Sequence, residues 1–399
     1  MTIVTDPQDI PAQRKGLAAS TTIVLATACG LIAANLYYAQ PLAGPIGAAI
    51  GLSAEATGLI VTLTQIGYRL GLLLIVPLGD LIENRSLVVG LIGIITVALL
   101  GAGFATTAPA FLASALFIGL GSVAVQVLVP YAAHLSPEAI RGRVVGNVMS
   151  GLMLGIMLAR PVSSIIAEFA PWHIVFFLSA GVMILLALVL GRTLPKRVPS
   201  SKLSYAALLA SMGSLALTTP ILRRRALYQA CLFGAFSLFW TTMPLLLASP
   251  TFDLSQGGIA LFALAGVAGA VAAPIAGRVA DRGWSRPATA LGMLAVAGAF
   301  LMTHIAPDSS VVALGLMVVA AVVLDFGVSA NMTLGQRAIF SLGAEYRGRI
   351  NGIYMATFFV GGALGSAVGG WAFARGGWPL TSWIGLAFPI AALLYFTTE

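Results

Sequence analysis

Three ionisable side chains lie inside long apolar stretches of this sequence: Arg69, Arg160 and Asp325. An unpaired charge in hydrocarbon costs roughly 3 kcal/mol even on lenient insertion scales, so we expect each charge to face an interior and to have a partner there. A buried carboxylate can take up and release a proton, and a guanidinium can hold an anionic group. Gln65 and Arg69 are one helical turn apart, so we expect both to reach the same partner. These residues predict a polar centre inside an apolar bundle.

The composition predicts a membrane protein. Hydrophobic residues make up 59% of the 399 residues and charged residues 9%, against roughly 45–50% and about 25% in soluble domains. A soluble fold could not bury so much apolar surface in its own core, so hydrocarbon is the solvent that suits this chain. Twelve apolar segments are long enough for the roughly 20 residues of a spanning helix. They are residues 20–46, 54–80, 86–104, 110–134, 144–168, 173–193, 226–249, 256–280, 287–305, 310–336, 348–373 and 379–396.

Three landmarks recur at nearly one offset along the chain. EAIRGRVVG at 138–146 returns as EYRGRING at 345–352, an offset of 347 − 141 = 206. The turns at Asp80 and Asp281 are 281 − 80 = 201 residues apart, and the prolines that end NLYYAQPL and LFWTTMPL are 244 − 41 = 203 apart. The sequence therefore predicts two similar halves, which in membrane proteins are typical of transporters that rock around a central site.

Most of the 21 lysines and arginines fall in loops on one side of the apolar segments. Positively charged loops stay on the cytoplasmic side, so we expect a multi-pass protein of the cell (inner) membrane with both termini cytoplasmic. On this interpretation, the net charge of +8 reflects the orientation of the chain in the membrane. We expect no nucleic-acid partner, because no basic patch with interleaved aromatics stands apart from these loops.

The segments divide the chain into a cytoplasmic N-terminal tail (1–19), a first six-helix bundle (20–193), a cytoplasmic linker (194–225) and a second six-helix bundle (226–399). The tail lacks the apolar core and cleavage site of a signal peptide. The linker is either a helix along the membrane surface or a flexible tether. Cys29 and Cys231 lie singly in apolar segments, so we expect them to pack there and expect no disulfide or metal site.

Glycines recur on the fifth and eleventh segments, among them Gly146, Gly151, Gly155, Gly361 and Gly365. Small residues at this spacing allow close and smooth helix contacts, as two moving halves require. The alternative is that membrane helices are simply rich in glycine.

Several motifs resemble the major facilitator superfamily over essentially the whole chain. The turn after the second segment of each half, PLGDLIENR and AGRVADRGWSR, is similar to that family's Gly-x-x-x-Asp-Arg signature. NLYYAQPL, VPLGD and GIMLARPVSS are similar to its bacterial drug/proton antiporter-like branch. The resemblance implies an all-α membrane protein with twelve transmembrane helices in two pseudo-symmetric six-helix bundles.

The resemblance also implies a gate between the halves at the cytoplasmic face. Asp80 is expected to meet the start of helix 11, and Asp281 the start of helix 5, when that side is shut. A carboxylate there accepts hydrogen bonds from free N–H groups at a helix N-terminus, for about 1 kcal/mol each. The alternative is that these charges only set orientation. The expected gating residues are Asp80, Arg85, Arg141, Arg143, Asp281, Arg282, Arg286, Arg347 and Arg349. Glu83 and Asn84 depart from the family's pattern of Gly and Arg, so the first clamp is expected to be weaker.

In this family, helices 1, 4, 7 and 10 line the cavity and helices 2, 5, 8 and 11 line the gap between the halves. A few convergent polar groups among aromatics are typical of a small-molecule pocket. The substrate-binding residues expected on this basis are Asn35, Tyr38, Gln40, Gln65, Arg69, Gln126, Arg160, Trp240, Thr241 and Asn331. For Arg160 the alternative is a structural role, bonding backbone carbonyls beside Pro161.

Asp325 is the candidate proton carrier, because it is the acidic residue that lies well inside an apolar segment. Arg69 or Arg160 would be its counter-charge. Many proton-driven relatives carry an arginine on helix 4, but the segment ALFIGLGSVAVQ has none. This departure leaves the usual coupling route in question.

Three functions compete. The leading hypothesis is a proton-coupled exporter of an amphipathic drug-like compound or metabolite. The second is an importer or symporter of a small organic anion, because the apolar segments contain two arginines and one aspartate. The third, a membrane enzyme or receptor, needs a catalytic cluster or signalling domain, and the sequence shows no metal-spaced His or Cys set and no phosphate loop. The expected partners are a small molecule, protons and lipid; we expect a monomer with no cofactor.

Overall fold

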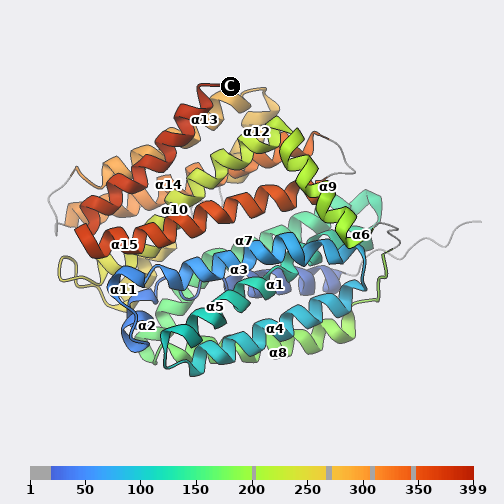
Figure 1. The fold of residues 1–399 in the computed structure, drawn as a ribbon, viewed down its shortest axis with the longest axis horizontal. Helices are drawn as coiled ribbons and strands as arrows, with labels where there is room; N and C mark the ends of the chain where they lie inside the picture. Colours follow the sequence, from blue (N-terminus) through green and yellow to red (C-terminus); the bar gives the residue numbers. More distant parts are fainter. Residues whose placement is uncertain (1–18, 200–203, 267–271, 306–310, 343–346) are drawn as a thin grey trace, which may run out of the picture.

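The computed structural model describes residues 19–199, 204–266, 272–305, 311–342 and 347–399. Figure 1 shows two groups of long helices that run side by side, one formed by the first half of the chain and one by the second. The described residues contain nine helices that are long and apolar enough to cross a membrane.

The first group consists of α1 (Ala19–Ala34), α2 (Ala43–Ala49), α3 (Leu59–Leu74), α4 (Asn84–Phe104), α5 (Ala108–Ser122), α6 (Ala124–Leu135), α7 (Glu138–Phe169) and α8 (His173–Thr193), with short 3-10 helices at Ala54–Ala56 and Val76–Asp80. The second group follows α9 (Tyr205–Thr218) and consists of α10 (Pro220–Leu247), α11 (Gln256–Ala263), α12 (Ala272–Asp281), α13 (Ser285–Met302), α14 (Val311–Phe340) and α15 (Arg347–Phe396). The last two predicted segments both lie in α15, which is broken at Gly376 and Gly377.

The first predicted segment, 20–46, is not one helix. Residues 35–42 form turns between α1 and α2, with Tyr37 N–H donating to the Ala34 carbonyl and Gln40 N–H to the Tyr37 carbonyl. Pro41 has no N–H to donate, which favours the break. Irregular backbone at membrane depth is tolerated where it is buried in protein, and broken helices often mark binding sites.

The same close helix contact occurs in both halves. A Cβ atom at Gly155 of α7 would lie 2.1 Å from the carbonyl oxygen of Gly30 in α1, and one at Gly365 of α15 would lie 2.0 Å from that of Gly234 in α10. The paired positions are 234 − 30 = 204 and 365 − 155 = 210 residues apart, close to the offsets of the sequence repeat. The glycines therefore bring the backbones of equivalent helix pairs into contact.

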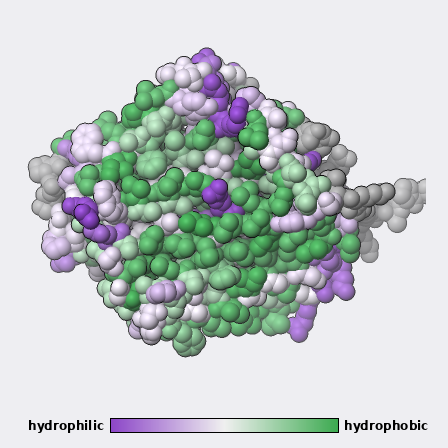
Figure 2. Space-filling model, in the orientation of Figure 1, coloured by the Kyte–Doolittle hydropathy of each residue, from purple (hydrophilic) through white to green (hydrophobic). Residues whose placement is uncertain are grey.

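The surface is hydrophobic in a broad band. Figure 2 shows hydrophobic residues covering most of the visible face, with most hydrophilic residues near its edges and a small hydrophilic patch near the middle. Large apolar side chains such as Val97 and Leu185 are 71% and 62% exposed. Soluble monomers rarely expose such large apolar patches, so this band is the surface that contacts lipid.

One end of the bundle, here called the arginine-rich end, carries the start of α4, the end of α8, α9 and the starts of α10 and α15 (Figure 1). The linker between the halves contains α9, which contacts both of them. The Tyr205 hydroxyl donates to the Leu74 carbonyl at the end of α3 (2.7 Å), and Arg349 of α15 donates to the Ser211 hydroxyl (3.0 Å). The linker therefore contains a helix, and its position along the membrane surface stays a prediction.

The glycine contact predicts a difference between two substitutions on α7. We expect Gly155→Ala to lower the free energy of unfolding by about 2 kcal/mol, because the added methyl group forces α1 and α7 apart. Gly146→Ala is the matched control, since nothing lies within 4 Å of a Cβ atom there. Thermal unfolding of the purified variants would measure the difference; equal melting temperatures would contradict the prediction.

Candidate functional site

Arg160 is the centre of the candidate site. It lies in α7, directly before Pro161, and only 3% of the residue is exposed. Its Nε donates to the Gln40 side-chain oxygen at 2.7 Å, so the break in the first helix supplies a partner. The Nη2 nitrogen is buried and has no hydrogen-bond partner. A buried cation with a free donor is costly, and such groups mark functional sites.

Three aromatic rings surround this guanidinium. Its carbon atom lies 4.5 Å from the centre of the Trp240 ring and 5.1 Å from those of Tyr37 and Phe236. Cation–π attraction of this kind strengthens when the cation is removed from water. The rings therefore stabilise the buried charge and leave one donor of Arg160 free for another group.

Asp325 joins the centre through Trp240. The indole N–H of Trp240 in α10 donates to Asp325 Oδ1 in α14 at 2.8 Å, and Asp325 is 5% exposed. Among the ion pairs between described residues, none links Asp325 directly to Arg160. Trp240 thus contacts both charges, one on its ring face and one on its N–H, and it connects a charge of the first half with a charge of the second.

Gly266, just after α11, lies against the same carboxylate. A Cβ atom at this position would be 2.8 Å from Asp325 Oδ2 and 3.1 Å from a ring carbon of Trp240. A side chain larger than hydrogen would therefore displace the two groups that hold the centre together.

The structure places the other expected site residues elsewhere. Gln65 donates to the Ser237 hydroxyl across the halves at 2.7 Å, and its own oxygen is buried without a partner. Gln126 donates to the Tyr68 hydroxyl at 2.9 Å. Asn35 accepts from Ser179 within the first half at 2.6 Å, and Asn331 donates to Gln229 within the second at 2.9 Å. Of the residues predicted from sequence, Gln40, Arg160, Trp240 and Asp325 come together.

The expectation that Arg69 faces the interior is wrong. Arg69 is exposed on α3, beside the exposed Leu70 and Leu74, and pairs with no described residue. Helical spacing places Gln65 and Arg69 near one face, but Gln65 points across to α10 while Arg69 points outward. Arg69 is therefore not part of the central site, and it is not a counter-charge for Asp325.

Within the described part of the chain, the side chains of Tyr38 and Thr241 make no specific polar contact that would assign them a role in the site. Tyr38 is partly buried and forms no hydrogen bond with another residue that the structure describes. Thr241 is fully buried with a hydroxyl oxygen that has no partner. Tyr37 and Phe236, which sequence reasoning missed, contact Arg160 instead. Their signal was the pair of aromatic runs, NLYYAQPL and FSLFWTTMPL, at equivalent positions of the two halves.

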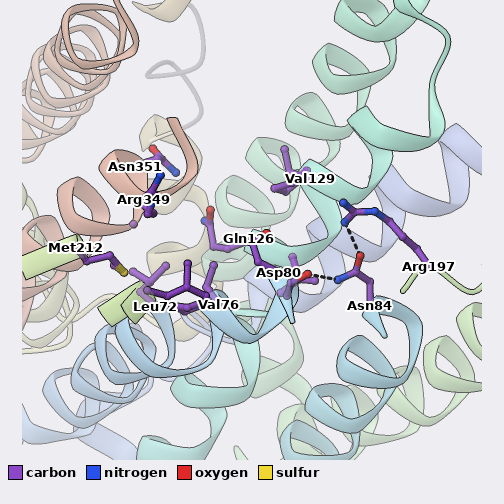
Figure 3. Close-up of a pocket in the computed structure, with 16 residues that line it drawn as sticks. Leu72, Val76, Asp80, Asn84, Gln126, Val129, Arg197, Met212, Arg349 and Asn351 are labelled. Carbon is purple, nitrogen blue, oxygen red and sulfur yellow. Dashed lines mark hydrogen bonds between the residues drawn. The ribbon is translucent and has the colours of Figure 1, made fainter. Parts of the chain in front are cut away.

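A vestibule opens at the arginine-rich end. It contains about 930 Å³ of empty space, part of it open to solvent, between the Val76–Asp80 turn, α6, α9 and the start of α15. In Figure 3, Arg349 and Asn351 lie across this space from Asp80 and Asn84. The two halves are thus apart at this end.

The turn after α3 is held by residues other than its aspartate. Asn84 donates to the Gly79 carbonyl at 2.6 Å and accepts from Arg197 at 2.7 Å (Figure 3). Glu83 caps α4 by accepting from the N–H groups of Arg85 and Ser86. Desolvation acts to raise the pKa of Glu83, but the hydrogen bonds from Ser86 and Arg85 outweigh it and lower the pKa below its usual value. The departures from the family signature therefore have structural roles.

The gating residues remain predictions. Asp80 is exposed and contacts no ion-pair partner among the described residues. Arg85 donates to the Leu194 carbonyl, Arg286 lies over the Phe396 ring, and Arg282 is exposed. The side chains of Arg141, Arg143, Asp281 and Arg347 lie outside the described residues.

Two similar helical halves, with a polar centre between them and a vestibule at one end, are typical of a multi-pass membrane transporter. A family model described as the Major Facilitator Superfamily matches residues 23–339. The chain belongs to this superfamily, so it is a secondary transporter of small molecules and not an enzyme.

Relatives of this chain cover nearly its whole length. The "Uncharacterized transporter YgaY" of Escherichia coli O157:H7 is 39% identical over 378 residues, covering 95% of both chains. The "Probable transporter SCO4007" of Streptomyces coelicolor is 32% identical over 386 residues, covering 93% of this chain and 88% of that one. Among solved structures, a bacterial homologue of the human lysosomal transporter Spinster, inward-facing and unoccupied, has a TM-score of 0.75 at 14% identity and covers 95% of this chain and 96% of that one. The all-α membrane fold expected from the sequence is confirmed.

The position of Trp240 predicts a specific loss when its N–H is removed. We expect Trp240→Phe to keep the ring beside Arg160 and to lower the transport rate about tenfold, because a hydrogen bond to a charged group contributes roughly 1.5–3 kcal/mol. Trp378→Phe is the matched control, since its buried indole N–H donates to Thr303 away from this site. Equal transport by both variants in proteoliposomes would contradict the prediction.

Proposed function

We propose that this protein is a proton-coupled exporter of an amphipathic drug-like compound or metabolite. It would lie in the cell (inner) membrane with its arginine-rich end and both termini in the cytoplasm. The observation that carries the proposal is the chain of contacts from Arg160 through Trp240 to Asp325 between the two halves. The resemblance of the helix 1 and helix 5 motifs to the drug/proton antiporter-like branch favours export.

Asp325 has the properties of a proton carrier in this arrangement. Its carboxylate is buried, and its partner across Trp240 is a cation held by the other half. Protonation removes the negative charge and weakens the hydrogen bond from Trp240, because ionised acceptors form the stronger bonds. Protonation also removes the attraction between this carboxylate of the second half and the Arg160 cation of the first half, so uptake of a proton weakens the contact between the halves and its release restores the contact.

The lining of the site matches an amphipathic cargo. Tyr37, Phe236 and Trp240 offer ring faces to an apolar body, while Gln40, Arg160 and Asp325 offer polar groups. In an exchanger, the cargo and the proton bind the same site in turn, and each excludes the other. A cargo donor group that approaches Asp325 meets the ionised carboxylate and is displaced when the carboxylate takes up a proton.

One observation favours the second candidate, co-transport of a small organic anion with a proton. The free Nη2 of Arg160 would donate a hydrogen bond to a carboxylate oxygen of such an anion. Anion binding there would leave Asp325 without its counter-charge and so promote its protonation. Cargo and proton would then move in the same direction.

The direction of flux under an imposed gradient separates the two candidates. With proteoliposomes and a proton gradient, export predicts that cargo moves against the proton flow, and anion co-transport predicts that it moves with it. A thermal-shift screen against anionic, cationic and neutral amphiphiles would first supply the test compound. If the proton gradient does not change the flux of the cargo, both candidate functions are excluded.

Asp325→Asn tests the proton carrier directly. We expect gradient-driven transport to fall below about one tenth of the wild-type rate while exchange of cargo for cargo persists, because the variant keeps the shape of the site and loses its titratable group. Asp253→Asn, in a loop with φ of 49°, is the matched control, since Asn tolerates this backbone conformation. Full gradient-driven transport by Asp325→Asn would exclude this residue from coupling.

A further inference from the structure

The end of the bundle opposite the arginine-rich end is closed by contacts between the halves. Thr62 of α3 shares a hydrogen bond with Ser366 of α15 at 2.7 Å. A Cβ atom at Gly370 of α15 would lie 2.6 Å from the backbone nitrogen of Gly58. Glu55 forms an ion pair with Arg375 at 2.7 Å. For a cargo to pass through this end, these contacts must break.

One further contact crosses the halves at this end and differs in kind. Glu168, in the last turn of α7, accepts a hydrogen bond from the backbone N–H of Gly257 in the first turn of α11, at 2.6 Å. The Ser255 side chain caps the neighbouring N–H of Gly258. The first N–H groups of a helix lack partners within it and carry partial positive charge, so an ionised carboxylate is favoured there. A short hydrogen bond to an ionised acceptor is also stronger than a neutral one.

The other end of α11 lies at the central site. The helix spans eight residues, Gln256–Ala263, and Gly266 follows it against the Asp325 carboxylate and the Trp240 ring. One short element of the second half is thus held by the first half at one end and packed against the candidate proton carrier at the other. A shift of Asp325 or Trp240 toward Gly266 would push on the segment that Glu168 holds.

We infer that Glu168 is a gating residue that keeps this end shut by capping α11, and that α11 connects the gate to the central site. Glu168 reaches the start of α11 only when the halves are closed at this end. The contact therefore favours the state in which the vestibule at the arginine-rich end is open. The inference concerns which end is open. It therefore stands or fails separately from the role of Asp325 in proton transfer.

The Glu55–Arg375 pair supplies a matched comparison across the same seam. Both of its side chains are about half exposed, 48% and 59%, and exposed ion pairs contribute little because solvent screens them. Glu168 is also exposed, but its partner is a helix N-terminus fixed in the fold and not a mobile side chain. Ordering this contact costs less side-chain entropy.

Distances between spin labels would test the gate. Cysteines at Thr106 and Ile305, exposed in the two halves at this end, would carry the labels in a chain with Cys29 and Cys231 replaced by alanine. We expect Glu168→Gln to raise the population with this end open about fivefold, in the range of ordinary coupling between states. Glu55→Gln is expected to change it less than about twofold. No change with Glu168→Gln, or an equal change with Glu55→Gln, would overturn the gating role.

A second substitution tests the connection through α11. Gly266→Ala places a methyl group against Asp325, so we expect it to open the same end without touching Glu168. Gly298→Ala in α13 is the control, because nothing lies within 4 Å of a Cβ atom there. If Gly266→Ala impairs transport but leaves the label distances unchanged, the connection is wrong while the cap stands. Melting temperatures would show that each variant is folded.

Discussion

Hydrocarbon cannot solvate an ionised side chain, and this constraint governs the centre of the protein. Arg160 and Asp325 come from different halves and are both almost fully buried, yet no ion pair between described residues joins them. Trp240 contacts both, Arg160 through its ring face and Asp325 through its N–H. The halves are therefore held at the centre by an arrangement whose strength depends on the charge state of one carboxylate.

The remaining contacts arrange the ends of the bundle around that centre. Glycine pairs bring α7 against α1 and α15 against α10, so each half is rigidly packed through backbone contact. Between the halves, the contacts include the hydrogen bonds Gln65–Ser237 and Thr62–Ser366, one exposed ion pair, and the close approach of Gly370 to Gly58 at the closed end. Close packing within each half allows the halves to move as rigid bodies, and the small residues at the contact between them allow that contact to separate. The open vestibule at the arginine-rich end and the closed opposite end are one position of that motion.

Part of the site could be predicted from the sequence, because rare residue types mark it. Arg160 and Asp325 stand out as charges in apolar segments, and Trp240 as part of a repeated aromatic run. Arg69 has the same sequence signal and lies outside the site. Gln40 accepts a hydrogen bond from Arg160 because the first helix is broken there, whereas the sequence predicted a continuous apolar segment. Periodicity tells which residues share a face of a helix, but not how that helix is rotated against its neighbours.

The sequence by itself determined the membrane location, the all-helical class and the duplication, because these follow from composition, segment length and repeated spacing. Only the tertiary structure decided that Trp240 contacts both charges, that Tyr37 and not Tyr38 contacts Arg160, and that Glu168 caps a helix 89 positions further along the chain. These facts depend on contacts between residues far apart in the chain. Such contacts are set by the packing of the two halves, which no local pattern records.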